Sequence, residues 1–446
     1  MLLLKNKIGK RQIILLCLLF QLIPPLIIRA QSYTSYFTGN PLDKVTVPLG
    51  GVCLMGGATE HDEAMKWFLQ QSTGGDILVL RVSGSNGYNN YMFSQLGITV
   101  NSVETIVFNS AVASGEAYIH QKIKQAEAIW FAGGDQWDYI SYWRNTFIDS
   151  LINDGVLNRN IVIGGTSAGM AIQGGFYFSA RKGTITSEEA LSNPFNAKMT
   201  VDSSSFLKNK YLENVITDTH YNDPDRKGRH VTFLARILSE WGVEAKGIAS
   251  DAYAAICIDS DGLARCYGDY PKSNDFLYFI QTNCELSLPG PEVCTAQVPL
   301  EWNRGGEAIK VYKVSGTNSG QNTFNLNDWN SGSGGSWEHW YISNGVLYES
   351  SGDNPDCPLS QFNTNQDPKK LFAYPNPANG SVLEILFPGV DSFRLSVFDT
   401  FGNEIDTDVQ KSWSNKQINI SGFPDGVYIV VAIAEDEVRQ VKVVVN

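Results

Sequence analysis

Apolar runs alternate with helical patterns along the first half of the chain. Five short runs have the pattern of strands, at 50–55, 76–82, 104–108, 127–132 and 160–164. Amphipathic stretches separate them, and glycine-rich turns follow several of them. Continuous apolar strands between helices are typical of a parallel sheet covered on both faces. We therefore predict an α/β fold from Gly50 to about Ile258, with ligand-binding loops at the carboxyl ends of the strands.

The pattern changes after residue 268. From about 268 to 350, Tyr, Trp, Asn, Gly and Ser dominate, and short strands such as 308–314 occur. This pattern predicts a β-rich extension of the same domain, with a surface loop at the Asn/Gly/Ser-rich residues 315–336. The sequence of residues 351–370 is typical of a linker.

The last part of the chain, 371–446, is purely β in pattern. Short alternating segments are separated by turn sequences, which predicts a small antiparallel β-sandwich. It resembles the C-terminal sorting domain of proteins exported by the type IX secretion system of Bacteroidetes. The matching pieces are Tyr374-Pro375-Asn376-Pro377, Val397-Phe398-Asp399 with Gly402, Gly426-Val427-Tyr428 and Lys442-Val443-Val444-Val445. The resemblance implies the type IX machinery as a partner and removal of this domain at the cell surface.

Residues 1–30 have the layout of a secretory signal peptide. Four basic residues in the first twelve precede an apolar run from Ile13 to Ile28, and Ala30 follows. The run is short for a membrane span and contains two prolines. We therefore expect export through the periplasm, to the outside or to the cell surface.

Charge and cysteine content narrow the function classes further. A formal net charge of −12 argues against a nucleic-acid partner, which requires a dense basic surface. Without Cys17 in the signal, the seven cysteines become six, and an even number in an exported chain permits disulfides. The nearest sequence pairs are 284–294 and 257–266, but spacing does not decide the connectivity. No pair has the CxxC spacing of a zinc site, and we expect no metal.

The sharpest chemical motif is Gly165-Thr166-Ser167-Ala168-Gly169, which directly follows an apolar strand. This is the G-x-S-x-G form, in which small residues let the strand turn tightly into a helix and expose the serine. The amide of Ala168 then points at the same space and can donate to an oxyanion. A second glycine turn, Gly133-Gly134-Asp135-Gln136, also follows a strand, so Gly134 is a candidate for a second oxyanion donor.

The candidate base is His220, which ends the apolar segment Val215–His220. Activation of a serine needs a histidine that a carboxylate holds in place. His61 follows a strand and a glycine turn and is a weaker rival. Arg226, Lys227 and Arg229 form a basic cluster close behind His220 in the sequence.

Together these three motifs resemble the serine peptidase family that contains cyanophycinase and the dipeptidase acting on N-terminal aspartyl peptides. The resemblance spans about residues 45–315 and implies a flavodoxin-like sheet similar to that of class I glutamine amidotransferases, without a cofactor. It implies Ser167 as nucleophile, His220 as base, Gly134 and Ala168 as oxyanion amides, and Gln136, Asp218 and Arg229 as substrate-binding residues. The chain departs from cyanophycinases at Thr219, Lys227 and Ala252, where those enzymes carry Gln, Arg and an acid.

The sequence leaves two candidates for the acidic member of the triad, Asp251 and the pair Glu188 and Glu189. Family members carry an acidic pair after a glycine-rich strand, and here Asp251 keeps one of the two acids, so Asp251 is our choice to orient His220. Glu188 and Glu189 are rivals, although acids in the first turn of a helix explain that pair equally well.

The prediction is an exported serine peptidase that cleaves a peptide or isopeptide bond of cyanophycin or of a related small acidic peptide. The domain order is a signal peptide (1–30), a hydrolase domain (31–350), a linker (351–370) and a sorting domain (371–446). The alternative is a catalytically inactive member of the same fold that binds peptides at the cell surface. Relatives often dimerise, so a homodimer is compatible with the resemblance, although the sequence indicates no interface.

Overall fold

The computed structural model describes residues 31–203 and 206–356 and, of the C-terminal part, residues 371–374, 378, 382–386, 393–399, 402–405, 409–411, 416–434 and 437–445. The predicted signal peptide and most of the predicted linker lie outside these residues. The chain divides into two compact units, Met1–Asp356 and Cys357–Asn446. Each unit is described by itself.

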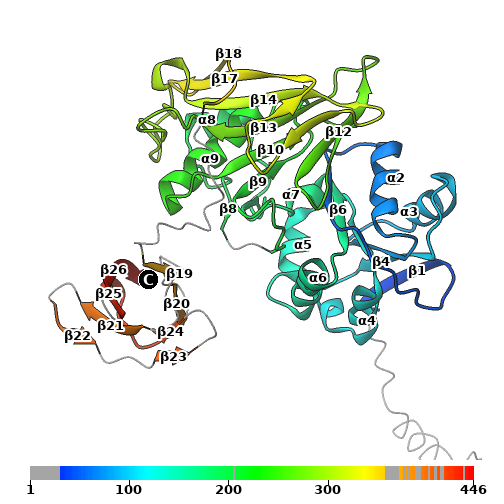
Figure 1. Ribbon diagram of the computed structural model, residues 1–446, viewed down its shortest axis with the longest axis horizontal. Coiled ribbons are helices and arrows are strands. Elements are labelled where there is room, and N and C mark those ends of the chain that lie inside the picture. The colour runs from blue at the N-terminus through cyan, green and yellow to red at the C-terminus, as the bar shows by residue number, and fades with distance from the viewer. Residues whose placement is uncertain are drawn as a thin grey trace, which may run out of the picture. The chain divides into compact units, whose positions relative to one another are not determined.

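A ten-stranded sheet forms the centre of the first unit (Figure 1). Its five central strands are parallel and run in the order β4-β3-β5-β6-β2. They are β2 (Val52–Met55), β3 (Asp76–Arg81), β4 (Ser102–Phe108), β5 (Ala128–Phe131) and β6 (Val162–Thr166). All five lie where the apolar runs predicted them. The predicted α/β class is confirmed.

Antiparallel strands extend this sheet at both edges. At one edge lies β1 (Tyr33–Gly39), and at the other lie β11 (Ala255–Ile258), β12 (Leu263–Tyr270), β15 (Asn322–Asn325) and β16 (Gly332–Ser333). Helix α2 (Asp62–Gln71) packs on one face with residues of α3 (Gly87–Asn90) and of the π-helical turn Tyr91–Gln95. The other face carries α4 (Ala117–Gln125), α5 (Gln136–Trp143) and α6 (Phe147–Asn158).

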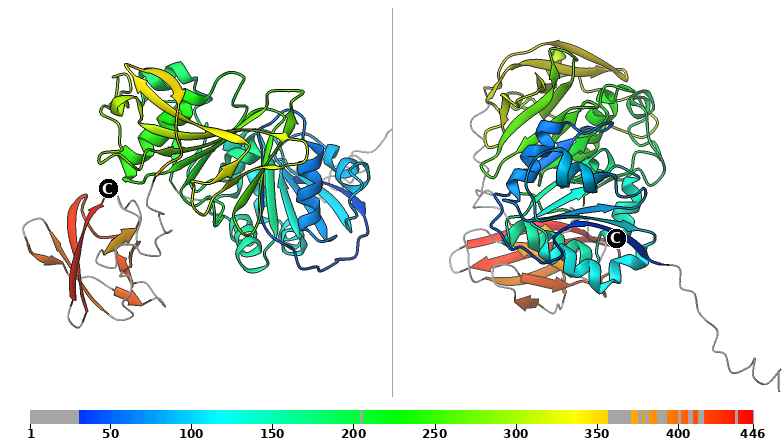
Figure 2. Two further views of the ribbon diagram at one scale, coloured as in Figure 1. Left: turned by 45° about the horizontal axis from the view of Figure 1, so that its top comes forward. Right: turned by 90° about the vertical axis from the view of Figure 1, so that its right-hand side faces the viewer.

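The predicted β-rich extension forms most of a second, six-stranded sheet in the order β18-β17-β14-β13-β10-β9. Its strands are β9 (Val215–Asp218), β10 (Lys246–Ser250), β13 (Phe276–Thr282), β14 (Ile309–Ser315), β17 (Gly335–Ser343) and β18 (Val346–Ser351). Helices α8 (Ser187–Ser192) and α9 (Lys227–Trp241) pack into the same core as this sheet. Figure 2 shows the second sheet from two further sides.

The predicted surface loop at 315–336 is wrong in part. Residues 322–325 and 332–333 form the strands β15 and β16 at the edge of the large sheet. Phe324 and Trp329 are buried in the main core, where Phe324 stacks on Phe279. Two large apolar side chains therefore anchor a segment whose composition alone is typical of a loop.

The cysteines do not pair as neighbours in the sequence. Cys284 is in a disulfide, whereas Cys53, Cys257, Cys266 and Cys294 are free thiols. The Sγ atoms of Cys53 and Cys257 lie 3.7 Å apart on the adjacent strands β2 and β11, without a covalent bond.

The described strands of the second unit form two four-stranded antiparallel sheets that share one hydrophobic core. One contains β19 (Phe372–Tyr374), β20 (Val382–Leu386), β24 (Lys416–Asn419) and β23 (Val409–Lys411). The other contains β22 (Glu404–Ile405), β21 (Arg394–Asp399), β25 (Gly426–Ala434) and β26 (Glu437–Val445). In neither unit do the described residues include a helix long and apolar enough to cross a membrane.

Candidate active site

Ser167 lies at the sharp turn between β6 and the short helix α7 (Ala168–Ala171). Its φ of 52° is in the left-handed region, which a non-glycine residue adopts only at a cost in backbone energy. The flanking glycines are required by close packing. A Cβ on Gly169 would lie 2.0 Å from the Phe131 carbonyl oxygen, and one on Gly165 would lie 2.6 Å from the Gly169 backbone.

His220 supplies the partner of this serine. Its Nε2 lies 2.9 Å from the Ser167 Oγ, within hydrogen-bond distance. His220 follows β9 by two residues, so it comes from the second sheet, whereas Ser167 comes from the first. Its own φ is 46°, and its amide donates to the Gly56 carbonyl oxygen at 2.9 Å. The structure thus brings together the predicted nucleophile and the predicted base.

Gly57 determines how close the His220 ring can approach the loop after β2. A Cβ on Gly57 would lie 2.2 Å from both Cε1 and Nε2 of that ring. The φ of Gly57 is +132°, which side chains other than hydrogen rarely allow. The double glycine after the first strand was visible in the sequence, but its contact with the histidine was not.

The surroundings of His220 favour the neutral imidazole. Burial lowers the pKa of His220 below its usual value, and the nearby Arg226 guanidinium lowers it further, while Asp218 acts in the opposite direction. A neutral imidazole can accept the proton of a serine hydroxyl, so this shift suits a general base.

The other four histidines are engaged elsewhere. The Nδ1 of His61 accepts from the Ala64 amide at the start of α2. His120 contacts the Ser114 carbonyl oxygen, His230 is buried against the Ile216 carbonyl oxygen, and His339 lies 3.1 Å from Asp353. His61 therefore has a local structural role as a helix cap.

Asp218 and Arg229, both expected to bind substrate, bind each other instead. The Arg229 Nε donates to the Asp218 Oδ2 at 2.8 Å, and a second guanidinium nitrogen donates to Oδ1. Both side chains are about 5% exposed or less. Although burial opposes ionisation, the Arg229 guanidinium holds the pKa of Asp218 below its usual value. This bidentate pair engages both charges, and the substrate-binding role of the two residues stays a prediction.

Arg226 is the cation left without an ion partner beside His220. One of its terminal nitrogens donates to the Thr219 carbonyl oxygen at 2.8 Å, while its buried Nε has no partner among the described residues. The positive charge of Arg226 contributes to the lowered pKa of His220. The basic cluster was visible in the sequence, but not which of its members would stay unpaired.

The structure does not bring Asp251 into contact with the His220 ring. The Asp251 Oδ2 accepts from the Phe276 amide at 2.9 Å, and its buried Oδ1 has no partner among the described residues. Burial raises the pKa of Asp251 to about 6. Asp251 lies close to the loop that supports His220, since a Cβ on Gly56 would lie 2.0 Å from the Asp251 carbonyl oxygen.

The rival pair Glu188 and Glu189 lies in the first turn of α8. Glu189 completes a capping box with Thr186 and binds Lys198 at 2.7 Å, and Glu188 is exposed. This arrangement confirms the helix-start interpretation of the two acids. Within residues 31–203 and 206–356, we find no hydrogen bond from the His220 ring to a carboxylate.

The second glycine turn lies beside the serine. A Cβ on Gly133 would lie 3.7 Å from the Ser167 Cβ, whereas one on Gly134 would lie 3.2 Å from the Tyr139 hydroxyl. Asp135 caps α5 by accepting from the Trp137 amide. Gln136 is half-buried, and its Nε2 donates to the Phe178 carbonyl oxygen at 3.4 Å.

Comparison with known families agrees with this geometry. Residues 88–195 match the model of peptidase family S51. This match covers about a quarter of the chain, so it is a similarity of that region to the family. Residues 372–446 match the secretion system C-terminal sorting domain. Both predicted resemblances are confirmed, and the sorting domain indicates type IX export, so the protein is secreted or held at the cell surface. The S51 match includes Ser167 but ends before His220.

Solved structures of peptidases are similar to about half of the chain. A peptidase from an acI-B1 Actinobacterium is 15% identical, covers 50% of this chain and 89% of its own, and has a TM-score of 0.38. A putative peptidase E protein from Listeria monocytogenes EGD-e is 16% identical, covers 49% and 98%, and has a TM-score of 0.33. No curated protein matches the chain.

Proposed function

We propose that the first unit is an active hydrolase that cleaves a peptide or isopeptide bond through Ser167 and His220. The Ser167 Oγ attacks the carbonyl carbon while the His220 Nε2 takes its proton. Backbone amides at Ala168 and Gly134 hold the oxygen that becomes negative. The intermediate then expels the amine, which takes the proton from His220, and water cleaves the resulting ester by the same steps. The Ser167–His220 distance of 2.9 Å is the observation that carries this proposal.

The proposed substrate carries a carboxylate near the scissile bond. Arg226 is a partly buried cation without an acidic partner beside the base, and a carboxylate satisfies a guanidinium with two parallel hydrogen bonds. Small acidic peptides and cyanophycin, with its aspartate backbone, both meet this requirement. Gln136, at the start of α5, is the proposed neutral contact.

Labelling with a fluorophosphonate probe tests the nucleophile. The full chain should be labelled, Ser167→Ala should not, and Ser187→Ala, a serine at the start of α8, should be labelled as the parent is. Hydrolysis of cyanophycin and of aspartyl dipeptides should then depend on Ser167 and weaken in Arg226→Gln. Equal labelling of Ser167→Ala and the parent would remove the assignment.

A catalytically inactive, peptide-binding protein is the second candidate. The lack of a hydrogen bond between a carboxylate and His220 in the described part of the chain favours it, because the carboxylate of a triad orients the histidine and stabilises its protonated form. Binding of acidic peptides without labelling or hydrolysis would identify this alternative.

A further inference from the structure

Strand β1 is the outermost strand of the large sheet on its side. It pairs in antiparallel register with β4 along all seven residues, from Tyr33 opposite Phe108 to Gly39 opposite Ser102. Among the described strands, β4 is its only partner. Figure 1 shows β1 at this edge of the sheet, beside β4.

Hydrogen bonds at both ends of the β1–β4 pairing show which residues of β1 face β4. The Asn109 amide donates to the Ser32 carbonyl oxygen at 2.9 Å, and the Asn40 amide donates to the Asn101 carbonyl oxygen at 3.0 Å. Hydrogen-bonded positions alternate along an antiparallel pair, so the even-numbered residues of β1 face β4. The backbone N–H and C=O groups that point outwards belong to Tyr33, Ser35, Phe37 and Gly39.

This edge lacks the features that normally prevent pairing with another strand. Natural edge strands are often very short, or carry charges or proline. β16, at the opposite edge of the same sheet, has two residues, and β18, at an edge of the second sheet, carries Glu349 in an ion pair with Lys227. β1 has seven residues, with no charged side chain and no proline.

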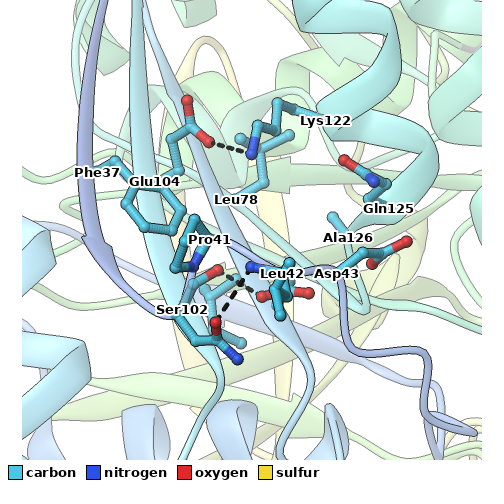
Figure 3. A pocket seen from close by; sticks show the side chains of 13 residues that line it. Phe37, Pro41, Leu42, Asp43, Leu78, Ser102, Glu104, Lys122, Gln125 and Ala126 are labelled. Carbon is cyan, nitrogen blue, oxygen red and sulfur yellow. Dashed lines mark hydrogen bonds and ion pairs between the residues drawn. The ribbon is translucent and has the colours of Figure 1, made fainter.

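The side chains of Tyr33, Ser35 and Phe37 contact residues of α4 and β4. Figure 3 shows Phe37 beside Glu104 and Lys122. Ser35 donates to the Glu104 carboxylate, Lys122 lies 5.2 Å from the centre of the Phe37 ring, and Tyr33 stacks on Tyr118. Phe37 is still 40% exposed. The hollow beside it has a volume of about 20 Å³, close to the space for one water, so it is too small for an organic ligand.

We propose that a second copy of the chain occupies this edge, with the two β1 strands antiparallel about a two-fold axis at Ser35. This register pairs Ser35 with Ser35 and Tyr33 with Phe37 of the second copy, and it uses the outward-facing backbone groups of these three residues. A strand that pairs with itself places like residues across the axis, where charges would repel. Because β1 is uncharged, no such repulsion arises, and two aromatic cross-strand pairs add contact area.

Sedimentation of the full chain over a wide dilution series tests the proposal. The parent should show a reversible doubling of mass. Ser35→Pro removes the central outward N–H and the hydroxyl contact with Glu104 but no backbone hydrogen bond to β4, so it should be monomeric. Ser35→Ala loses the same hydroxyl contact with Glu104 but keeps the N–H, so it should dimerise as the parent does. If the parent is monomeric at every concentration, the proposal is overturned. The strand of another protein is then the remaining candidate for this edge. A Ser35→Pro variant that dimerises as the parent does, or a monomeric Ser35→Ala, also overturns it.

Hydrogen exchange of the unaltered chain is a second test, and it does not require that the Ser35→Pro variant folds. The amides of Tyr33, Ser35 and Phe37 should exchange more slowly at high protein concentration, while those of Thr34 and Tyr36, which already face β4, should not change. Exchange at the odd-numbered amides that does not depend on concentration overturns the proposal.

Discussion

Different interactions hold the two sides of the candidate site, the nucleophile side around Ser167 and the base side around His220. On the nucleophile side, β6 meets α7 in a turn where backbone atoms crowd together, so glycine and a strained serine are needed. On the base side, β9 ends at Asp218, which forms a buried ion pair with Arg229, and Arg226 lies close by. Added atoms are therefore costly at Gly165 and Gly169 on the nucleophile side, and loss of the Asp218 charge is costly on the base side.

Few contacts join these two sides. The Thr217 hydroxyl of β9 donates to the Met170 carbonyl oxygen of α7 at 2.8 Å, and the His220 amide donates to the loop after β2. The position of His220 against Ser167 thus depends on how the two sheets pack. Local steric contacts therefore place Ser167, whereas tertiary contacts place His220.

The largest expected effect tests whether the two sides act as one unit. Ser167→Ala and His220→Ala should each lower kcat by a factor on the order of 10⁶, and the double variant should be no slower than either, because both groups serve one proton transfer. Steady-state kinetics on the peptide that the parent hydrolyses measures this. A double variant whose loss is the product of the two single losses would contradict the shared mechanism.

Removal of a buried charge should affect the base side strongly. Asp218→Ala leaves the Arg229 guanidinium buried without a counter-charge and should lower the free energy of unfolding by about 3–5 kcal/mol. Lys198→Ala, which breaks the more exposed Lys198–Glu189 pair, should cost about 0–1 kcal/mol. Urea unfolding of both variants measures the difference, and equal losses would refute the distinction.

An added methyl group should affect the contact between the two sides. In Gly57→Ala the new Cβ would overlap the His220 ring, so kcat/KM should fall about 100-fold through displacement of the base. Gly87→Ala is the matched control, because no atom lies within 4 Å of its added Cβ. Its activity should equal that of the parent. Unchanged activity in Gly57→Ala would show that the ring position is not set by this contact.

The smallest expected effect is a shift in pH dependence. Arg226 disfavours a second positive charge on His220, so Arg226→Gln should raise the pKa of His220. Protonated His220 cannot act as the base, so the acidic limb of the kcat/KM profile should move to higher pH. Lys66→Gln, a charge change on α2, should leave the profile in place. A profile of Arg226→Gln that coincides with that of the parent would exclude this role of Arg226.

Much of the fold follows from local patterns. The five parallel strands, the capped helix starts at Asp135 and Thr186 and the glycine-rich turn at Ser167 all depend on residues close together in the chain. The prediction of a surface loop at 315–336 is wrong in part because its strands depend on burial of Phe324 and Trp329 against distant residues. Short-range composition carries no information about such partners.

The sequence by itself determined the α/β class, the S51 resemblance around Ser167, the sorting domain and the identity of the candidate base. The tertiary structure decided which groups are paired. Within the described residues, Arg229 is paired with Asp218, Arg226 has no ion pair, and the Asp251 carboxylate accepts from the Phe276 amide. The reason is that a charge or a hydrogen bond is satisfied by whatever lies within about 3 Å, and residues from two different sheets determine that neighbourhood here.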